Sequence, residues 1–458
     1  MTSTDSSESL KELHGTGRTP VKTNTATEGL NYALTADGTG YLVKGIGNAT
    51  DTHIVIPDEY KGIPVVSIGF EAFYNCKSIT GVTIGSKVTS INNEAFEHCE
   101  GITSIIIPEG VTSIGDSVFL GCSGLKNVTV AKGNEKYTDV DGVLFNKDRT
   151  SLICYPAGKS ETTYNFPDGV TTIETYAFGY CHNITDISLP SSVKNICLYG
   201  FYGCYGLKSV NISEGLLTIG LGAFHGCSNL TSINIPCSVT SIEQGAFNFC
   251  ESLTSITIPG SVTSIGDNLF YACVGLKSVS VAKDNTKYCD TDGILLSKDK
   301  TTLICYPAGK TDTSYKISDG VKNIGPFAFS YCRALTSVTI GNGVVYIGHY
   351  AFSYCDNLTD VNVADGVIYI GDGTFSGCGG LKSVVIPGSV TYIGNCSFQD
   401  CQGLTSLTLK NTDGWRRCRV FPAETIGTAV EGVSLADKSV AATFFKSTYR
   451  DYNWLCGI

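Results

Sequence analysis

The amino-acid sequence predicts an α/β repeat fold: a solenoid with short parallel strands, short helical or 3-10 turns, and two hairpin-containing inserts. Two observations predict it. One pattern of residues returns every 23 positions along most of the 458-residue chain, and each copy ends in an alternation of apolar and polar residues that favours a short strand. A unit of this size cannot bury its own apolar face. Neighbouring copies must therefore stack and share a core.

The repeat is seen most clearly in its cysteines. Each copy reads, in order, an Ile-Gly pair, an Ala-Phe pair, a Cys, a Leu, and two Val or Ile residues separated by a polar residue. The cysteines that share this position are Cys76, Cys99, Cys122, Cys181, Cys204, Cys227, Cys250, Cys273, Cys332, Cys355, Cys378 and Cys401. Their usual step is 23 residues, but the steps from Cys122 to Cys181 and from Cys273 to Cys332 are 59 residues, which is one period plus 36. Two inserts therefore interrupt the repeats.

The two inserts, at about 131–169 and 282–320, are copies of one another. The sequence Leu-Ile-Cys-Tyr-Pro-Ala-Gly-Lys at 152–159 returns at 303–310, a displacement of 151 residues. This displacement indicates a larger duplication layered on the short repeat.

Each insert has the pattern of a hairpin. In the first insert, apolar stretches at 143–145 and 152–154 lie on either side of the polar turn 146–150. We expect this hairpin to protrude or to thicken the solenoid locally. We also expect one curved solenoid whose parallel ladder of strands runs from about Val82 to Leu409. The inserts interrupt the 23-residue period, but we expect the strands to remain stacked through them.

Within each repeat, the residues after the Cys form a short strand. Ile256 and Ile258 alternate with polar residues, and Pro259 ends the strand. A second extended stretch, such as 262–265, closes the repeat. The Ala-Phe segment is too short for a long helix and predicts one helical or 3-10 turn on the outer face. About fourteen layers spaced by about 4.8 Å would form a rod roughly 60 to 70 Å long.

The ends of the solenoid need caps. We expect a disordered polar segment at 1–29, an N-terminal hairpin cap at 30–67, the solenoid at 68–409 and a C-terminal cap at 410–458. Asp37-Gly38 lies between apolar stretches and is a hairpin-turn signal. Residues 434–437 resemble a capping box that opens an amphipathic helix through Phe444 and Phe445.

Composition excludes several classes of protein. The 42% hydrophobic content and 52 glycines are typical of a folded, turn-rich chain. The net charge of −10 makes nucleic acid a poor partner. The sequence has no apolar run long enough to span a membrane, and the polar N-terminus has no visible signal peptide, so export either uses no visible signal or the signal was removed. We expect a monomer.

The repeat resembles that of the BspA-like leucine-rich-repeat family. The shared unit, Ile-Gly-x-x-Ala-Phe-x-x-Cys-x-x-Leu-x-x-Ile-x-Ile-Pro, runs from about Ile68 to Leu409. Local departures are Cys197 for Gly, and Gly200 and Ser397 for Ala. The resemblance implies a leucine-rich-repeat solenoid at the cell surface or in the extracellular space of bacteria or protozoa. Some relatives bind host matrix proteins such as fibronectin and fibrinogen.

Residues that could carry chemistry have simpler explanations. The ladder cysteines point the same way, which disfavours the disulfide torsion, so we expect buried free thiols. The Gly-Lys-Ser at 158–160 lacks the upstream Gly of a phosphate-binding loop, and Asp139 and Asp141 suit a plain turn better than a calcium loop. The six histidines are scattered. We therefore expect no enzyme, no catalytic residue, no metal and no cofactor.

Binding residues are sought on the exposed strand positions. The polar residue between the two core Val or Ile forms a neutral stripe that includes Thr339 and Asn362. The position before the repeat Ile becomes Tyr346, Tyr369 and Tyr392 in three consecutive repeats. These tyrosines are either a structural cross-strand ladder or an exposed recognition patch that remains partly open to solvent. A weaker aromatic line, consisting of Tyr180, Tyr331 and Tyr354, is expected on the outer side.

These features favour a binding function. The leading hypothesis is a cell-surface or secreted adhesion and protein-recognition module that binds a host or extracellular-matrix protein. The alternatives are a carbohydrate-binding module, for which stacked tyrosines would offer ring faces to a glycan, and a structural spacer that displays another domain.

Overall fold

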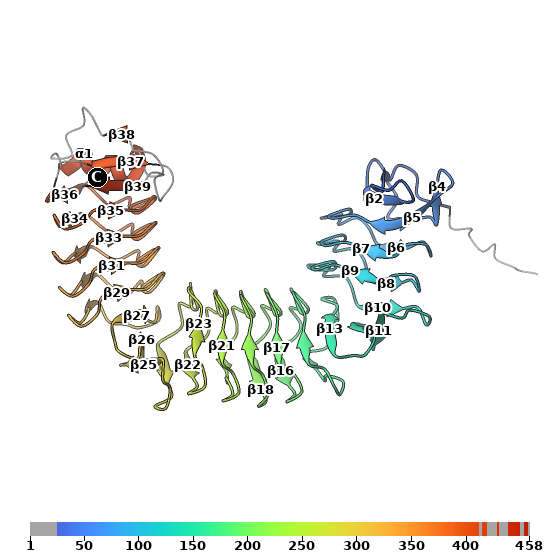
Figure 1. Cartoon of the computed structure of the whole chain (residues 1–458), viewed down its shortest axis with the longest axis horizontal. Helices are drawn as coiled ribbons and strands as arrows, with labels where there is room; N and C mark the ends of the chain where they lie inside the picture. Colours follow the sequence, from blue (N-terminus) through green and yellow to red (C-terminus); the bar gives the residue numbers. More distant parts are fainter. Residues whose placement is uncertain (1–24, 412–414, 419–427, 430–437, 449–452, 457–458) are drawn as a thin grey trace, which may run out of the picture.

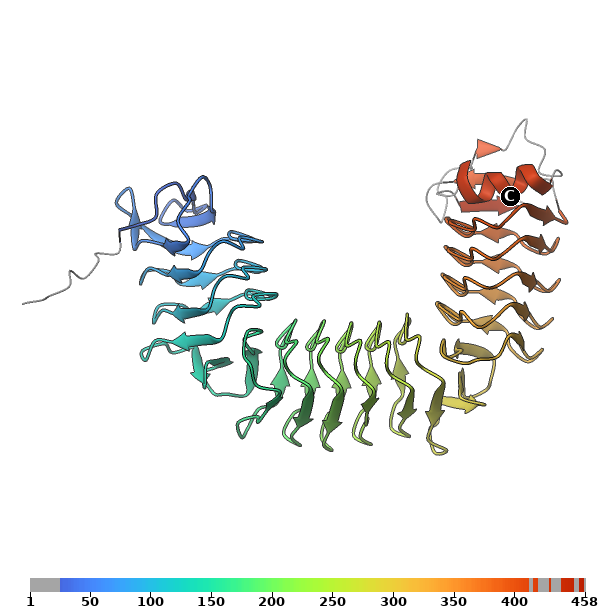
Figure 2. The same cartoon turned by 180° about the vertical axis from the view of Figure 1, so that it is seen from behind.

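The chain forms a solenoid with the outline of a U. The structure is a computed structural model that describes residues 25–411, 415–418, 428–429, 438–448 and 453–456. Most of the polar segment expected at 1–29 lies outside these residues. Three stacks of repeats meet at two corners (Figure 1, Figure 2), and each stack has its own apolar core. The corners coincide with the two inserts.

Each repeat contributes one short strand to a ladder on the inner side of the U (Figure 1, Figure 2). These strands are β7 (Ser90–Ile91), β9 (Ser113–Ile114), β15 (Thr172–Ile173), β17 (Asn195–Ile196), β19 (Thr218–Ile219), β21 (Ser241–Ile242), β23 (Ser264–Ile265), β29 (Asn323–Ile324), β31 (Tyr346–Ile347), β33 (Tyr369–Ile370) and β35 (Tyr392–Ile393). Neighbours within a stack pair in parallel at the 23-residue step, as Thr218 does with Ser241. The repeat Ile is buried in nearly every copy, which fixes the register.

A second strand from each repeat lies on the outer side. These strands are β6 (Gly81–Thr83), β8 (Ser104–Ile107), β10 (Asn127–Val130), β14 (Thr163–Tyr164), β16 (Asp186–Leu189), β18 (Ser209–Ile212), β20 (Ser232–Ile233), β22 (Ser255–Ile258), β24 (Ser278–Val281), β28 (Ser314–Lys316), β30 (Ser337–Thr339), β32 (Asp360–Asn362), β34 (Ser383–Ile386) and β36 (Ser406–Leu409). In β22, Ile256 and Ile258 are buried while Ser255 and Thr257 are exposed. This is the period-two alternation predicted for the strand.

The expectation of one ladder from Val82 to Leu409 is wrong. The outer ladder ends at β10 and restarts at β14. It is interrupted again between β20 and β22, and it ends at β24 before it restarts at β28. The insert strands are β11 (Tyr137–Val140), β12 (Val143–Asn146), β13 (Ser151–Cys154), β25 (Tyr288–Thr291), β26 (Ile294–Ser297) and β27 (Thr302–Cys305). They pair antiparallel with each other, and β13 and β27 then pair in parallel with β15 and β29. The predicted hairpin is confirmed, but it forms the corner of a bent solenoid in place of a protrusion from a rod.

Caps close both ends of the described chain. At the N-terminal end are β1 (Asn31–Leu34), β2 (Tyr41–Gly45), β3 (His53–Val55), β4 (Glu59–Tyr60) and β5 (Ile63–Ile68), and the β1–β2 hairpin turns at Asp37-Gly38 as predicted. At the C-terminal end are β37 (Trp415–Cys418), β38 (Thr428–Ala429), α1 (Lys438–Thr443), the π-helix η1 (Phe444–Thr448) and β39 (Asn453–Cys456). Strand β39 pairs antiparallel with β35 and so ends the inner ladder. The proposed capping box at 434–437 lies outside the described residues.

The core is a stack of aromatic rings and thiols. Phe201, Phe224 and Phe247 are fully buried, and their ring centroids lie 5.2 and 5.7 Å apart in nearly parallel planes. Eleven of the twelve ladder cysteines are buried, and Cys76 at the first repeat is half-buried. The prediction that these cysteines pack in the core is confirmed.

The Ala-Phe segment differs from the expected helical or 3-10 turn, and it lies on the inner side, not the outer. Alternate amides make different bonds: Ala95 N–H donates back to Asn92 within its own repeat (3.3 Å), while Phe96 N–H donates to Val118 of the next repeat (3.1 Å). Glu94 and His98 have left-handed φ angles of 60° and 56°. This alternation produces isolated turns and prevents a continuous helix. We call the segment between each short strand and its ladder Cys the turn ridge.

Candidate functional site

The turn ridges carry an unusual set of aromatic residues. Eight of them have left-handed backbone conformations: Tyr176, Tyr180, Tyr199, Phe249, Phe327, Tyr331, Tyr350 and Tyr354. The same ridge positions are glycine in other repeats, for example Gly222, Gly373 and Gly377, which also have positive φ angles. A left-handed conformation costs a non-glycine residue about 1 to 2 kcal/mol, whereas glycine adopts it without strain. The chain thus retains aromatic side chains at positions where its own neighbouring repeats use glycine.

These rings form one continuous line along the inner side of the U, which we call the aromatic band. It consists of the eight residues above together with Tyr74, His98, Tyr202, Tyr205, His225 and Tyr271. The contacts cross both corners. The ring centroids of His98 and Tyr180 lie 5.7 Å apart across the first insert, and those of Tyr271 and Tyr331 lie 5.0 Å apart across the second. Rings from all three stacks therefore contribute to one surface.

The band is partly open to solvent and mostly uncharged. Tyr74, Tyr205, Tyr350 and Tyr354 are 37 to 48% exposed. Burial, and then the neighbouring tyrosines, raise the pKa of Tyr176 to about 12, so its hydroxyl is neutral at physiological pH. The chemistry offered by the band is that of apolar rings with hydroxyl groups, which suits recognition better than catalysis.

Acidic residues flank the band in the first stack. Glu71 lies in one ridge, and Glu94 and Glu97 lie in the next. Burial, followed by the charges of Glu94 and Glu71, raises the pKa of Glu97 to about 7. The Glu97 carboxylate is 3.6 Å from the imidazole Nε2 of His98. The band is therefore apolar with a locally acidic border.

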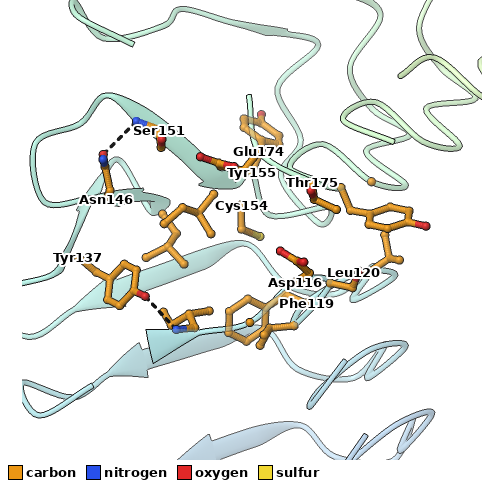
Figure 3. A pocket seen from close by; sticks show the side chains of 18 residues that line it. Asp116, Phe119, Leu120, Tyr137, Asn146, Ser151, Cys154, Tyr155, Glu174 and Thr175 are labelled. Carbon is orange, nitrogen blue, oxygen red and sulfur yellow. Dashed lines mark hydrogen bonds between the residues drawn. The ribbon is translucent and has the colours of Figure 1, made fainter. Parts of the chain in front are cut away.

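A cavity opens in the ridges at each corner. The first, with a volume of about 220 Å³, lies between the last ridge of the first stack and the first ridge of the second. Figure 3 shows Asp116 and Phe119 on one wall and Glu174 and Thr175 on the other, with Cys154 between them. Burial raises the pKa of the Cys154 thiol to about 12, which makes it a poor nucleophile.

Two hydrogen bonds hold the first cavity in shape. The N–H of Ile114 donates to the hydroxyl of Tyr137 (2.9 Å), and the N–H of Ser151 donates to the side chain of Asn146 (2.9 Å; Figure 3). The second cavity, of about 200 Å³, has equivalent walls 151 residues later, and Tyr288 there accepts from Ile265 N–H at 3.0 Å. The duplication seen in the sequence has therefore produced two related cavities.

The structure separates the residues predicted as a binding site. Tyr346, Tyr369 and Tyr392 stack with centroids 4.6 and 4.3 Å apart in the inner ladder. Tyr346 and Tyr369 are half-buried, but Tyr392 is only 5% exposed because β39 pairs with its strand. The expectation that all three rings remain partly exposed is wrong for Tyr392.

Thr339 and Asn362 lie in the outer ladder. Both are exposed, and they line a shallow polar hollow with Lys316, Asp319 and Lys410. The tyrosines belong to the other sheet of the same stack. The five predicted residues therefore do not form one site.

The aromatic band was largely missed in the sequence. The sequence predicts an aromatic line of Tyr180, Tyr331 and Tyr354, each one residue before a ladder Cys, on the outer side, whereas the structure places these residues in the inner band. Tyr176, Tyr199, Phe327 and Tyr350 share a second ridge position that the same 23-residue register would have identified. Their left-handed backbone has no sequence signal other than the glycines that replace them.

Two further properties bear on function. Among the described residues, no group of three or more His, Cys, Asp or Glu side chains is placed to hold a metal ion. No helix in the described part of the chain is long and apolar enough to cross a membrane.

A family model matches most of the solenoid. The model, described as the BspA type leucine rich repeat region, matches residues 50–152, 154–277 and 308–414 in six copies. The chain belongs to this family. The BspA-type repeat thus accounts for the 23-residue unit and for its succession of short parallel strands, and the resemblance seen in the sequence is confirmed.

Solved structures of similar proteins are also repeat proteins. A leucine-rich cell surface protein from Faecalibacterium prausnitzii A2-165 is 26% identical over 85% of this chain and 95% of its own, with a TM-score of 0.52. The pneumococcal vaccine antigen PcpA is 23% identical over 85% and 82%, with a TM-score of 0.47. A leucine-rich repeat protein from Bacteroides ovatus is 25% identical over 85% and 100%, with a TM-score of 0.40. No protein with a curated description matches the BspA-type chain.

Proposed function

We propose that the chain is a protein-recognition and adhesion module of the cell surface or extracellular space, which binds a host or extracellular-matrix protein through the inner side of the U. The observation that carries this proposal is the aromatic band. Most of its rings sit at left-handed positions that other ridges fill with glycine, so the fold itself does not require aromatic residues there. Strained residues of this kind cluster at functional sites, and aromatic side chains dominate binding hot spots.

Apolar neighbours extend the surface beyond the rings. Leu198 and Leu221 occupy adjacent ridges beside the band and are each nearly 40% exposed. Apolar side chains gathered on one side of a soluble fold favour an interface with another macromolecule. The similar protein from Faecalibacterium prausnitzii is described as a cell surface protein, which agrees with the proposed location.

A protein ligand is favoured over a glycan by how the rings are covered. Sugars stack on free ring faces, but Tyr354 stacks on Tyr331 by one face (4.8 Å) and its ring lies over Gly377. The exposed parts of such rings are edges and hydroxyl groups. These suit the mixed apolar and polar contacts of a protein interface.

The test is a binding screen of the whole chain against a panel of immobilised matrix proteins and a glycan array. For any ligand found, the Tyr350→Gly/Tyr354→Gly variant should weaken binding at least tenfold. Because these substitutions reproduce the residues of the next repeat, Gly373 and Gly377, folding should be retained. The matched control is Thr339→Ala/Asn362→Ala on the outer ladder of the same stack.

Each outcome separates the candidate functions. Loss of binding in the tyrosine variant alone supports the inner band. Loss in the outer variant alone would transfer the site to the polar hollow. Glycan binding without protein binding would favour the carbohydrate module, and no binding on either panel would favour the spacer.

A further inference from the structure

The turn ridges are linked by hydrogen bonds that all run in one direction. Glu94, Phe96 and His98 donate their N–H groups to the carbonyls of Asp116, Val118 and Leu120 in the next ridge, at 3.0, 3.1 and 2.8 Å. The same three bonds recur between later ridges of a stack. Every ridge therefore presents N–H groups to the ridge that follows it and carbonyl groups to the ridge before it.

At the first corner this ladder is incomplete. The insert supplies a shortened turn: Leu152 takes the place of the repeat Ile and Tyr155 that of the repeat Phe, only three residues later instead of five. Tyr155 stacks on Phe178 at 5.0 Å, and its N–H donates to Ala177 at 2.8 Å, so the central bond of the ladder is preserved. The residues that would have made the outer bonds are missing from the shortened turn.

The walls of the corner cavity consequently carry unpaired backbone groups. Within the described chain, no protein acceptor takes the N–H groups of Ser117 and Phe119 on one wall. On the opposite wall, no N–H is donated to the carbonyl of Thr175, and the carbonyl of Gly179 has only the Cys181 thiol at 3.9 Å. All four residues line the cavity.

The second corner repeats this arrangement. Within the described chain, no protein acceptor takes the N–H groups of Asn268 and Phe270. No N–H is donated to the carbonyl of Pro326, and the carbonyl of Ser330 has only the Cys332 thiol at 4.0 Å. All four residues line the second cavity, and Tyr306 preserves the central bond to Ala328 at 2.7 Å. The two duplicated corners thus leave the same donors and acceptors unpaired. The feature belongs to the architecture of the insert and not to one local substitution.

Donors on one wall and acceptors on the other select the class of ligand. An anion would satisfy only the N–H wall, and a cation only the carbonyl wall. A peptide backbone carries both kinds of group in alternation, and main-chain hydrogen bonding to incomplete ladders is a known mode of peptide recognition. In the first cavity the carboxylates of Asp116 and Glu174 favour a basic side chain on that peptide. The second cavity has Asp267, and Gly325 stands in place of the glutamate.

We propose that each corner cavity is a slot for a short peptide segment of a partner protein, with an arginine or lysine side chain directed to the carboxylates that line the cavity. This proposal rests on the proposed protein-recognition function and deepens it, because it states how a partner would be held at the two bends. The backbone of the bound peptide would supply the hydrogen bonds that are missing from the interrupted ridge ladder. The acidic pair makes the first slot the tighter of the two.

The test uses the whole chain and blocked pentapeptides of sequence Ala-Ala-Xaa-Ala-Ala, with Arg, Ala or Glu at the centre. Titration followed by ligand-observed NMR should give a Kd for the Arg peptide at least fivefold lower than for the Glu peptide. N-methylation of the backbone at the Arg position should weaken binding at least tenfold, because it removes the donor to the carbonyl wall. Equal binding of the N-methylated peptide would overturn the proposal and leave a purely ionic attraction.

Protein variants locate the site. Thr175→Trp should fill the mouth of the first slot and abolish the tighter binding step. The matched control, Gln244→Trp, places the same side chain at the same exposed ridge position three repeats later, where the ridge ladder is uninterrupted, and should leave both steps intact. Unchanged peptide binding in Thr175→Trp would refute the slot.

The two proposals can fail separately. If a matrix protein binds through the aromatic band while the Arg peptide does not bind, the slot is refuted and the proposed function stands. If the peptide binds in the slot but no protein on the panel does, the peptide site stands and the adhesion function is refuted.

Discussion

The thiol of Cys227 donates a hydrogen bond to the backbone carbonyl of Phe201, 3.2 Å away in the preceding repeat. The same bond, always across 26 residues, links Cys99 to Phe73 and Cys401 to Phe375 at 3.0 Å. The repeat Cys is therefore a small apolar residue that also satisfies a buried carbonyl group, which alanine or valine could not do. This dual role explains why one position of the repeat is so consistently cysteine.

The ladder thiols should be inaccessible in the native protein. Burial raises the pKa of Cys227 well above its usual value, whereas Cys237 is exposed. Native alkylation read by mass spectrometry should label Cys237 quickly and the buried ladder cysteines only after denaturation. Rapid labelling of Cys227, or a disulfide between Cys227 and Cys250, would contradict this prediction.

Two phenylalanines of one repeat should respond oppositely to truncation. Phe247 is fully buried between Phe224 and Phe270, so Phe247→Ala should lower the free energy of unfolding by about 3 to 5 kcal/mol. Phe249 has a φ of 58°, so Phe249→Gly should be neutral or should stabilise by about 1 kcal/mol through relief of strain. Urea denaturation measures both. A loss below about 1 kcal/mol for Phe247→Ala would show that the repeat register is wrong.

Glu97 should make stability depend on pH. Its pKa is raised to about 7 in the folded chain, so the folded state favours the protonated form. The stabilisation is present in full below the unfolded pKa of about 4.5 and is lost as pH rises toward 7. Glu97→Gln should therefore raise the free energy of unfolding at pH 8 by about 1 to 2 kcal/mol and flatten its decline between pH 4.5 and 7. The exposed Glu135→Gln is the control, and an unaltered pH profile in Glu97→Gln would refute the prediction.

Tyr369 should distinguish a structural ladder from a recognition patch. If its half-buried ring contacts the ligand, Tyr369→Ala should weaken binding about thirtyfold, with a smaller effect on folding. Its position between Tyr346 and Tyr392, with centroids 4.6 and 4.3 Å away, also suits a structural role. Calorimetry and binding should be measured together on the same variant. A lowered melting temperature with unchanged affinity would show that the three stacked tyrosines contribute to stability alone.

The repeat and its strands could be predicted because their signals are local and periodic. Alternation in 253–258 fixed which side chains of β22 face the core, and Asp37-Gly38 fixed the β1–β2 turn. The cysteine step fixed the register of neighbouring repeats. These features depend on residues a few positions apart or on one repeated spacing.

The corners and the candidate site could not be predicted in the same way. The hairpin at β12 and β13 was visible, but the path of the chain through it depends on β13 pairing antiparallel on one side and in parallel on the other. The contact of Tyr180 with His98 and the burial of Tyr392 next to β39 both join residues that are far apart in the sequence. Sequence spacing alone does not encode such contacts.

The two bends are localised in the inserts, so the opening between the arms is set by the middle stack alone. Each regular repeat in that stack separates the arms by about 4.8 Å, the spacing of paired strands. The distance between the two arms therefore changes in multiples of the strand spacing as repeats are added to or removed from the middle stack. Removing one 23-residue repeat from the middle stack would bring the two arms closer together by about one strand spacing, about 4.8 Å. Gain or loss of single repeats in the middle stack would therefore adapt the distance between the arms to partners of different size. The two bends would stay unchanged.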